Sequence, residues 1–286
     1  MLDFNQIKIY SINNRKNLVK IEDFPDPNDA SITCKEKNLE ILADKIKESE
    51  YNIAMIGGHV IKTGMSVYLN KLIEKGFIQH IAMNGAAAIH DFEIAYHGET
   101  SEDVSTSIKD GTFGFVRETP ELMNQAINSS NDGMGTSLAK AMKNFHHRNT
   151  SLLYTSHIFN VPATVHVSFG TDIIHMHPSF DPEKTGRATY DDFKTFTESV
   201  SKLEDGTIMN IGSAVIMPEV FLKSLSLSRN LTGNPKKFTA ANLDMIDHYR
   251  PRENIVNRPT QEGGLGLNIK AKHQDTIPSL YKLLVS

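Results

Sequence analysis

The sequence predicts an α/β protein with a doubly wound, mostly parallel sheet and helices on both faces, in a Rossmann-like arrangement. Short apolar runs alternate with amphipathic helical segments, which is the pattern of strand–helix–strand units. One apolar run ends in the double glycine at 57–58, and the next ends in a group of very small residues at 84–88. Open parallel sheets bind ligands outside the carboxyl ends of their strands. We therefore expect the site in the stretch 51–99.

Composition narrows the class of protein. The 286 residues are 39% hydrophobic and 22% charged, as in ordinary globular proteins. The net charge of -4 argues against a nucleic-acid surface, which needs a basic stripe. The single cysteine, Cys34, allows no internal disulfide and no cysteine pair for zinc, which fits a reducing cytoplasm. The first residues lack an apolar signal core, and no run approaches the ~18 apolar residues of a membrane span.

The chain divides into an arm and one large domain. Residues 1–35 are polar, and the turn cluster at 23–31 contains two prolines, so we expect an arm or loop there. Residues 36–286 contain no linker and are expected to form a single α/β domain. Its first helix is predicted at 36–49, where apolar residues recur at helical spacing.

The first strand–helix–strand unit follows. The run 51–56 suits a strand buried on both faces, and Thr63 can cap the next helix. Gly76 ends that helix, and 77–83 is the second strand. The helix shows one apolar face, formed by Met65, Tyr68, Leu69, Leu72 and Ile73.

The remaining elements follow the same alternation. The polar, glycine-rich stretch 98–119 is expected to be a functional loop with a short helix near 102–108, and 170–186 a second site loop. Pro218 suits the first turn of a helix that follows the strand at 207–211. The other predicted elements are helices at 120–127, 135–145, 151–159, 191–203 and 277–284, and strands at 163–168, 238–243 and 267–271.

The two groups of small residues are candidate ligand turns. Gly57 and Gly58 let backbone N–H groups approach a ligand, and the following helix adds a positive dipole end. Asn84, Gly85 and Ala86 do the same one strand later. Such turns suit a phosphate, a dinucleotide or a carboxylate, although neither has the G-x-G-x-x-G spacing. The alternative is that both are tight turns that pack closely.

Histidines and carboxylates gather near the predicted strand ends. His59 and His90 follow the two small-residue groups, and His175 and His177 follow the strand at 163–168. If these ends adjoin, the imidazoles serve general acid/base chemistry, because histidine titrates near neutrality. Alternatively, the four histidines hold a divalent metal together with Asp91 or Asp172, although the spacing matches no metal motif. His166, in mid-strand, is expected to be structural.

Lys62 and Glu99 complete the expected substrate-binding set with His175 and His177. Cations such as Lys62, Arg117 and the arginines at 250–258 could clamp an anionic substrate, or could be solvated surface groups. No G-x-S-x-G elbow or P-loop occurs, and Cys34 has no evident base nearby. These absences disfavour acyl transfer through a serine or cysteine and phosphoryl transfer through a P-loop.

From about residue 53 onward the chain resembles the deoxyhypusine synthase family. The resemblance is carried by IGGHVIKTG at 56–64, MNGAAAIHDF at 83–92, FGTDIIHMH at 169–177, IGSAV at 211–215 and VNRP at 256–259. It implies a Rossmann-like fold with an NAD site and a tetramer whose active sites lie between subunits. It also implies oxidation of spermidine and transfer of an aminobutyl group to a lysine of a translation factor.

The resemblance also assigns residues. It implies that Gly57, Gly58, Asn84, Gly85, Ala86, Asp172, Gly212 and Ser213 lie along the dinucleotide. It places His90 and Asp91 where the family has an acidic pair near the amine substrate.

Three departures separate the chain from that family. Leu267 stands where the family's tryptophan-glycine-lysine segment has its lysine, and leucine cannot form an imine. Lys270 and Lys272 are nearby but out of register. His90 replaces an acidic residue that binds the amine, and the glycine triplet has become Gly-Ser-Ala at 212–214.

Three hypotheses follow, in order of preference. In the first, a divergent enzyme binds NAD and acts on a small amine or amino-acid-like metabolite without making deoxyhypusine. His90 and Asp91 are then the acid/base pair, and His59 is a further catalytic residue. In the second, the histidine cluster makes the protein a metal-dependent enzyme. In the third, it is a non-catalytic ligand-binding homologue.

Overall fold

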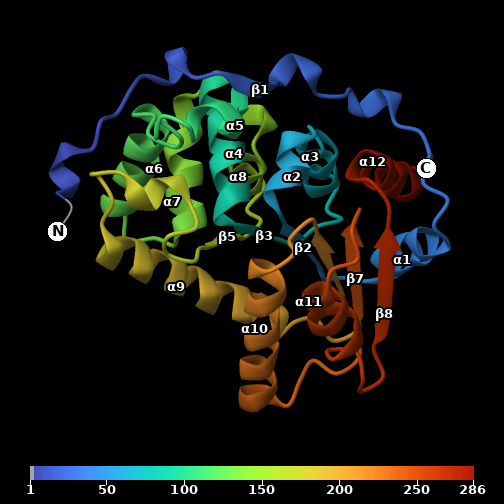
Figure 1. Cartoon of the computed structure of the whole chain (residues 1–286). Coiled ribbons are helices and arrows are strands. Elements are labelled where there is room, and N and C mark those ends of the chain that lie inside the picture. Colours follow the sequence, from blue (N-terminus) through green and yellow to red (C-terminus); the bar gives the residue numbers. More distant parts are fainter. Residues whose placement is uncertain (1–2) are drawn as a thin grey trace.

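Six parallel strands form the central sheet, in the spatial order β5-β3-β2-β6-β7-β8 (Figure 1). The structure is a computed structural model, and it describes residues 3–286. Numbered along the chain, the strands stand in the order 3-2-1-4-5-6, which is the arrangement of dinucleotide-binding folds. The predicted doubly wound α/β fold is confirmed. The strands are β2 (Asn52–Ile56), β3 (His80–Asn84), β5 (Ala163–His166), β6 (Thr207–Ile211), β7 (Thr239–Asp244) and β8 (Leu265–Lys270).

The strand order reverses direction at β2. From β2 the chain first adds β3 and β5 on one side, and it later adds β6, β7 and β8 on the other. Ile56 pairs with Met83 of β3 and with Ile211 of β6, so these three strands end at the same edge. The next residues, Gly57, Gly85 and Gly212, therefore leave that edge side by side. This is the switch point at which such sheets bind ligands.

Helices cover both faces of the sheet (Figure 1). Because both faces are covered, all five residues of β2 are buried, and its side chains alternate between two apolar clusters. Ile56 and Leu267 belong to the larger cluster, and Met55 and Phe196 to the smaller. The larger cluster packs under α1 (Lys37–Glu48), α3 (Ser66–Glu74), α4 (Gly85–His97), α8 (Leu152–Ile158) and α12 (His273–Val285), and the smaller under α9 (Pro182–Val200), α10 (Ile216–Thr232) and the π-helical segment η8 (Arg252–Asn257).

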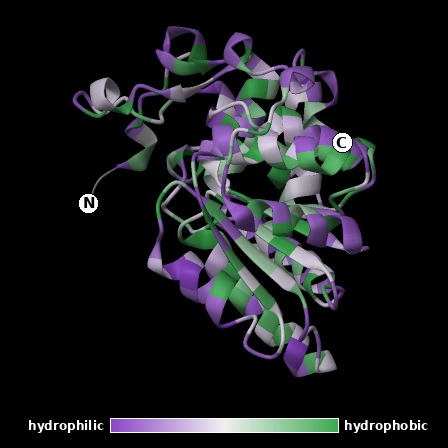
Figure 2. Cartoon of the chain, turned by 90° about the vertical axis from the view of Figure 1, so that its right-hand side faces the viewer, coloured by the Kyte–Doolittle hydropathy of each residue, from purple (hydrophilic) through white to green (hydrophobic). Residues whose placement is uncertain are grey.

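Shorter elements complete the domain. Around the carboxyl edge of the sheet lie α2 (Gly58–Lys62), α5 (Val104–Ser107), η7 (Ile173–Met176) and α11 (Tyr249–Pro251). Further elements are α6 (Glu118–Asn128), α7 (Met134–Ala141), η5 (Met142–Asn144) and η6 (Arg148–Thr150), of which α7 packs against β5 and η6 contacts α3, α4 and α8. Apolar residues concentrate in the strands and inner helix faces, and the arm and outer turns are mostly polar (Figure 2). Within residues 3–286, the helices are too short or too polar to cross a membrane.

The N-terminal arm runs across one side of the domain before α1 begins (Figure 1). It contains the short helical turns η1 (Phe4–Gln6), η2 (Ile12–Asn14), η3 (Ile21–Asp23) and η4 (Pro27–Asp29). Its strand β1 (Asn17–Lys20) pairs antiparallel with β4 (Glu99–Glu102), with Val19 opposite Thr100. The stretch 98–119, predicted as a loop, therefore begins with a strand. The pairing joins segments about 80 residues apart, which no local pattern indicates.

Helix starts differ from the prediction at several places. Thr63 does not begin a helix but ends α2, where its Oγ1 donates to the carbonyl of His59 at 3.0 Å. The small residues after β3 form the first turn of α4, because the Asn84 side chain accepts from the Ala87 N–H at 2.9 Å and caps the helix. Helix α9 begins at Pro182 rather than near 191, with Asp181 as its cap.

Candidate active site at the carboxyl edge of the sheet

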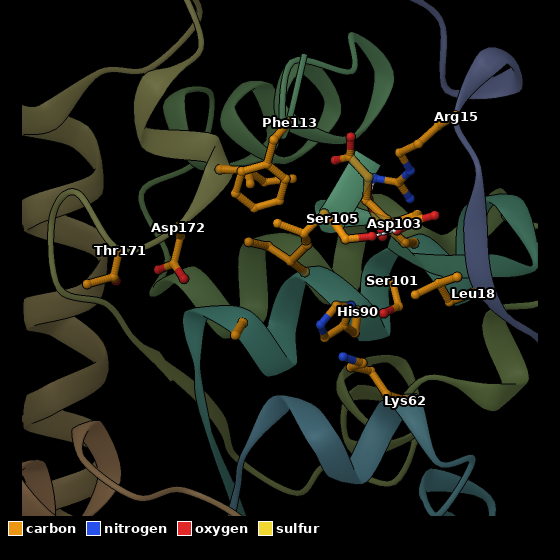
Figure 3. Close-up of a pocket in the computed structure, with 16 residues that line it drawn as sticks. Arg15, Leu18, Lys62, His90, Ser101, Asp103, Ser105, Phe113, Thr171 and Asp172 are labelled. Carbon is orange, nitrogen blue, oxygen red and sulfur yellow. Dashed lines mark hydrogen bonds and ion pairs between the residues drawn. The ribbon is translucent and has the colours of Figure 1, made fainter. Parts of the chain in front are cut away.

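A cavity of about 460 Å³ opens beside the first two turns of α4 (Figure 3). Asp172 and Thr171 stand on one side of it, and Arg15, Leu18 and Ser101 on the other. The arm, the end of α2, α4, β4, α5 and the η7 segment all contribute to its wall, through Arg15, Leu18, Lys62, Ala86, Ile89, His90, Glu93, Ser101, Glu102, Asp103, Val104, Ser105, Phe113, Thr171, Asp172 and Ile173.

His90 lines this cavity from α4. Its Nδ1 lies 2.7 Å from Thr100 Oγ1, and Thr100 in turn donates to Glu93 Oε2 at 2.5 Å. Burial lowers the pKa of His90 to about 4, since the charged ring would lose its hydration. His90 is therefore neutral at pH 7. Gly58 lies next to the His90 ring, and a Cβ at Gly58 would come within 3.2 Å of that ring.

A buried ion pair lies behind His90. Arg15 Nη1 stands 2.7 Å from Glu93 Oε1, and both side chains are 2% exposed. Burial raises the pKa of Glu93, but the Arg15 guanidinium outweighs it and holds that pKa below its usual value. Thr119 Oγ1 also donates to Glu93 Oε1, at 2.9 Å. Glu93 is thus an ionised carboxylate whose two oxygens are both engaged.

Lys62 and Asp172 place opposite charges on the cavity wall. Lys62 forms no ion pair with any other residue of 3–286, and it lies on the His90 side of the cavity (Figure 3). Asp172 packs against the start of α4, where a Cβ on Gly85 would lie 2.0 Å from its Oδ2. Burial raises the pKa of Asp172 to about 6. Burial therefore places the pKa of Asp172 above that of His90, and strongly shifted pKa values within one cavity are typical of functional sites.

Asp91 does not join His90 in the cavity, so the predicted acid/base pair is not formed. Asp91 is 1% exposed on the other side of α4. Its oxygens accept from the Ser151 hydroxyl at 2.5 Å and from the N–H groups of Leu152 and Leu153 at 2.8 and 3.2 Å. These N–H groups begin α8, so Asp91 caps that helix.

The glycine turns at the switch point pack against each other. A Cβ on Gly57 would lie 2.0 Å from the Gly212 carbonyl oxygen, and the Gly57 N–H already donates to Ile211 O at 2.9 Å. Gly212 has a φ of 70°, which favours glycine. Ser213 is buried, and its Oγ accepts from Met217 N at the start of α10, at 3.2 Å. Close packing alone therefore accounts for Gly57 and Gly212.

A second group of titratable residues lies at this edge, and it joins the predicted catalytic residue His59 to His273, which was not predicted. His273, at the start of α12, is fully buried, and a Cβ on Gly212 would lie 2.7 Å from its Nε2. Both of its ring nitrogens lack a partner among residues 3–286, and burial lowers its pKa to about 4. Its ring lies 5.6 Å from that of His59, and Asp244 at the end of β7 acts electrostatically on both. His59 thus faces His273 rather than the cavity.

The other predicted substrate residues lie outside the cavity wall. His175 Nδ1 accepts from the N–H groups of Gly170 and Asp172, both at 3.3 Å, and so shapes its own loop. His177 Nδ1 bonds to the Ser179 hydroxyl at 2.8 Å. Glu99 pairs with Lys20 at 3.0 Å on the partly exposed β1–β4 ribbon. His166, as expected for a structural histidine, is buried and bonded to Thr164.

The four histidines of the metal hypothesis do not converge. Within residues 3–286, no group of three or more His, Cys, Asp or Glu side chains is placed to hold a metal ion. Leu267, in place of the family's lysine, is 3% exposed in β8, opposite Ala241, and packs in the larger apolar cluster. Neither the metal alternative nor an imine at position 267 has geometric support.

Sequence reasoning missed Arg15, Glu93 and Thr100. One signal was present: Glu93 follows His90 by three residues, a spacing that puts both on one face of a helix. Nothing local indicated Arg15 or Thr100, because the arm and β4 reach α4 only through the tertiary fold.

Comparisons with known proteins support the fold. No protein-family model and no curated protein matches the sequence. A LOR/SDH-type protein from Methanococcus maripaludis S2 is 15% identical with a TM-score of 0.54, over 90% of this chain and 72% of its own. AgrE in its ternary complex with ornithine and NAD+ is 13% identical with a TM-score of 0.54, over 89% of this chain and 34% of AgrE. A structure from Entamoeba histolytica, assigned provisionally as a deoxyhypusine synthase, is 10% identical with a TM-score of 0.52, over 86% of both chains.

These identities show a shared fold and no more. The chain spans about a third of AgrE, so what AgrE binds as a whole protein does not pass directly to this chain. The fold resembles that of the deoxyhypusine synthase-like structure, in agreement with the resemblance at the level of sequence motifs.

Proposed function

We propose that this chain is an NAD-binding enzyme that acts on a small amine or amino-acid-like metabolite in the cavity beside α4. One observation carries the proposal: the cavity opens next to the switch point of a 3-2-1-4-5-6 sheet and holds a neutral His90 together with Asp172 and Lys62. A neutral imidazole accepts protons. A carboxylate and an ammonium group in one cavity suit a substrate that carries both charges.

The residues at the switch point fit the cofactor in part. The buried His273 offers ring nitrogens without a protein partner, beside the Gly212 turn. Ala86 is exposed in the first turn of α4, where backbone N–H groups lack helical partners. We place the dinucleotide along Gly58, Ala86 and Ser213, with the turns of Gly57, Gly85 and Gly212 as their support. NAD, when bound there, would accept a hydride.

Two features depart from dinucleotide-binding folds. The glycine fingerprint is absent, and β3 ends in Asn84, whose amide caps α4, where those folds carry an acidic residue for the ribose. Asp172 lies on the cavity wall next to Gly85, so we assign it to the substrate rather than to the dinucleotide.

The comparison with AgrE supports the substrate class. AgrE has been solved with ornithine and NAD+ together, and ornithine carries two amino groups and a carboxylate. In this chain His90 would take a proton from an amino group, and Lys62 would face the carboxylate. Deoxyhypusine synthesis is disfavoured, because Leu267 is a core residue that provides no amine.

The proposal is tested by ligand-induced stabilisation. Thermal unfolding is followed with NAD, and then with NAD plus ornithine, arginine or spermidine. A cofactor at a hundredfold its Kd adds about 2.7 kcal/mol. His90→Gln is the companion variant: it should keep NAD binding and lose substrate-dependent NADH formation. Failure of millimolar NAD to stabilise the native protein would overturn the proposal.

A non-catalytic ligand-binding role is the second candidate. The mutual packing of Gly57 and Gly212 favours it, since these glycines need no cofactor to explain them. NAD or amino-acid binding without any turnover by the native protein would select this role.

A cytoplasmic location and a homotetramer, implied by composition and by the family resemblance, remain predictions. Analytical ultracentrifugation tests the tetramer.

A further inference from the structure

We propose that Arg15, Glu93 and Thr100 form a positioning relay that fixes the proton of His90 on Nδ1 and leaves Nε2 as an unprotonated acceptor facing the cavity. The inference deepens the proposed function and rests on it in one respect, the role of His90 as proton acceptor. The assignment of the tautomer itself follows from a count of hydrogens.

Glu93 sets the direction of the hydrogen bonds in the relay. Its carboxylate is ionised and fully buried beside Arg15, so both of its oxygens accept hydrogen bonds. Thr100 has a single hydroxyl proton, and that proton points to Glu93 Oε2 at 2.5 Å. The lone pairs of Thr100 Oγ1 remain, and the group 2.7 Å from them is His90 Nδ1. Only an N–H at Nδ1 completes that bond, so the neutral ring has no proton on Nε2.

Nε2 is open to a ligand. It has no hydrogen-bond partner among residues 3–286, and it is not one of the buried polar atoms that the protein covers completely. Its residue lines the cavity. The lone pair of Nε2 is therefore the acceptor that His90 offers to a substrate N–H or O–H group.

Three segments hold the relay in place. His90 and Glu93 share one face of α4, and Thr100 is held by its pairing with Val19 of the arm. Arg15 is itself oriented by its Nε bond to Asn17 Oδ1, at 2.6 Å. The arm therefore contributes to the site, because its Arg15 guanidinium keeps Glu93 ionised and so keeps the Thr100 hydroxyl proton directed toward Glu93 and away from His90.

Burial is the main reason why the His90 ring is neutral. Among its charged neighbours Glu93 has the largest effect and favours a positive ring, whereas Lys62 and His59 of α2 and Arg15 of the arm oppose it. Glu102, Asp103 and Asp172 line the same cavity from the other elements. When a substrate ammonium gives its proton to Nε2, its N–H bond breaks, the electron pair stays on the amine, and the new N–H bond forms on the ring. The relay then faces an imidazolium.

The test measures the tautomer directly, without substrate or cofactor. Histidine side chains are labelled with 15N, and long-range 1H–15N spectra of the full chain are recorded at pH 7. The His90 signals are assigned by their loss in His90→Gln. Thr100→Val removes the hydroxyl of the relay. Thr119→Val is its matched control, because Thr119 also donates to Glu93, whereas the hydrogen bond of the His90 ring goes to Thr100. Thr100→Ser keeps the hydroxyl.

The expected result is a neutral His90 with its proton on Nδ1 in the native protein, in Thr119→Val and in Thr100→Ser. Thr100→Val should move most of the population to the Nε2–H form. A native His90 that is charged, or that carries its proton on Nε2, would overturn the inference. So would a folded Thr100→Val with an unchanged tautomer. If Thr100→Val fails to fold, the native spectrum still decides. NAD binding is measured separately, so failure of the proposed function would leave this result readable.

Discussion

Two neighbouring residues of α4, His90 and Asp91, lie in opposite environments, one facing a cavity and the other packed in the interior. On one side His90 faces a cavity and is bonded to Thr100 of β4, which belongs to the two-stranded β1–β4 sheet. On the other side Asp91 is enclosed by the start of α8 and bonded to Ser151 and two backbone N–H groups. Adjacent positions on a helix are separated by about 100°, so a pair that looks like an acid and a base in the sequence is divided between a site and a core.

The buried carboxylates on the two sides of α4 also differ in their pKa values. Glu93 has Arg15 beside it, and its pKa is held below the usual range. Asp91 has hydrogen-bond donors but forms no ion pair within residues 3–286, and burial raises its pKa to about 6. Ionisation on this helix is thus decided by a charge that arrives from the arm, far away in the sequence.

The largest effect is expected from breaking the cavity-side ion pair. Glu93→Gln leaves the Arg15 guanidinium buried without its partner, which should lower the free energy of unfolding by about 3–5 kcal/mol. Urea denaturation measures it. The control is Glu99→Gln, which breaks the partly exposed pair with Lys20 and should cost less than about 1 kcal/mol. Equal costs for the two variants would mean that the Arg15–Glu93 pair is not buried in solution.

On the packed side, Asp91→Ala should lower the free energy of unfolding by about 2 kcal/mol, because α8 loses its cap. The pH dependence of the free energy of unfolding separates the effect of the Asp91 charge from the effect of its hydrogen bonds to α8. Since the folded-state pKa of Asp91 is raised to about 6, its contribution is present below pH 4 and is lost as the pH rises through 6. Native protein should therefore lose stability relative to Asp91→Asn between pH 4 and 7. Parallel pH profiles for the two proteins would contradict this assignment.

His90 should show the opposite sign. Its folded-state pKa is lowered to about 4, so its contribution is present above pH 6.5 and is lost as the pH falls. At pH 5 the native protein should have lost about 2 kcal/mol that His90→Gln does not lose. The buried histidines 80, 166 and 273 are present in both the native protein and His90→Gln. The difference between the urea midpoints of the two proteins therefore reports on His90 alone. A difference that does not change between pH 7 and 5 would argue for a solvated ring.

The smallest effect on stability is expected at Lys62. This lysine has no ion pair within residues 3–286, so Lys62→Met should change the free energy of unfolding by less than about 0.5 kcal/mol. The pKa of His90 should nevertheless rise in this variant, since Lys62 is one of the charges that lower it. An NMR titration of the His90 ring measures the shift, with Lys75→Met as an exposed-lysine control. An unchanged His90 pKa would place Lys62 farther from the ring.

Much of the sheet was predictable because buried parallel strands are short apolar runs that end in small residues. The runs 51–56 and 207–211 agree with β2 and β6, and Gly57 and Gly212 do leave them at the switch point. The strand β4 was not predictable, because ETSE is polar and pairs with a segment of the arm. The predicted acid/base pair of His90 and Asp91 was wrong, because adjacency in the sequence does not show which side of a helix faces a cavity.

The sequence by itself determined the alternation of strands and helices, the glycines where two turns touch, and the leucine at position 267, where the family that the chain resembles has a lysine. Apolar periodicity and backbone freedom are local properties, so they can be read one segment at a time. Only the tertiary structure decided that Asp91 is a cap, that His59 faces His273, and that Arg15 controls the charge behind His90. The reason is physical: burial and electrostatic pairing depend on which distant segments meet, and these two quantities set the protonation state of each candidate residue.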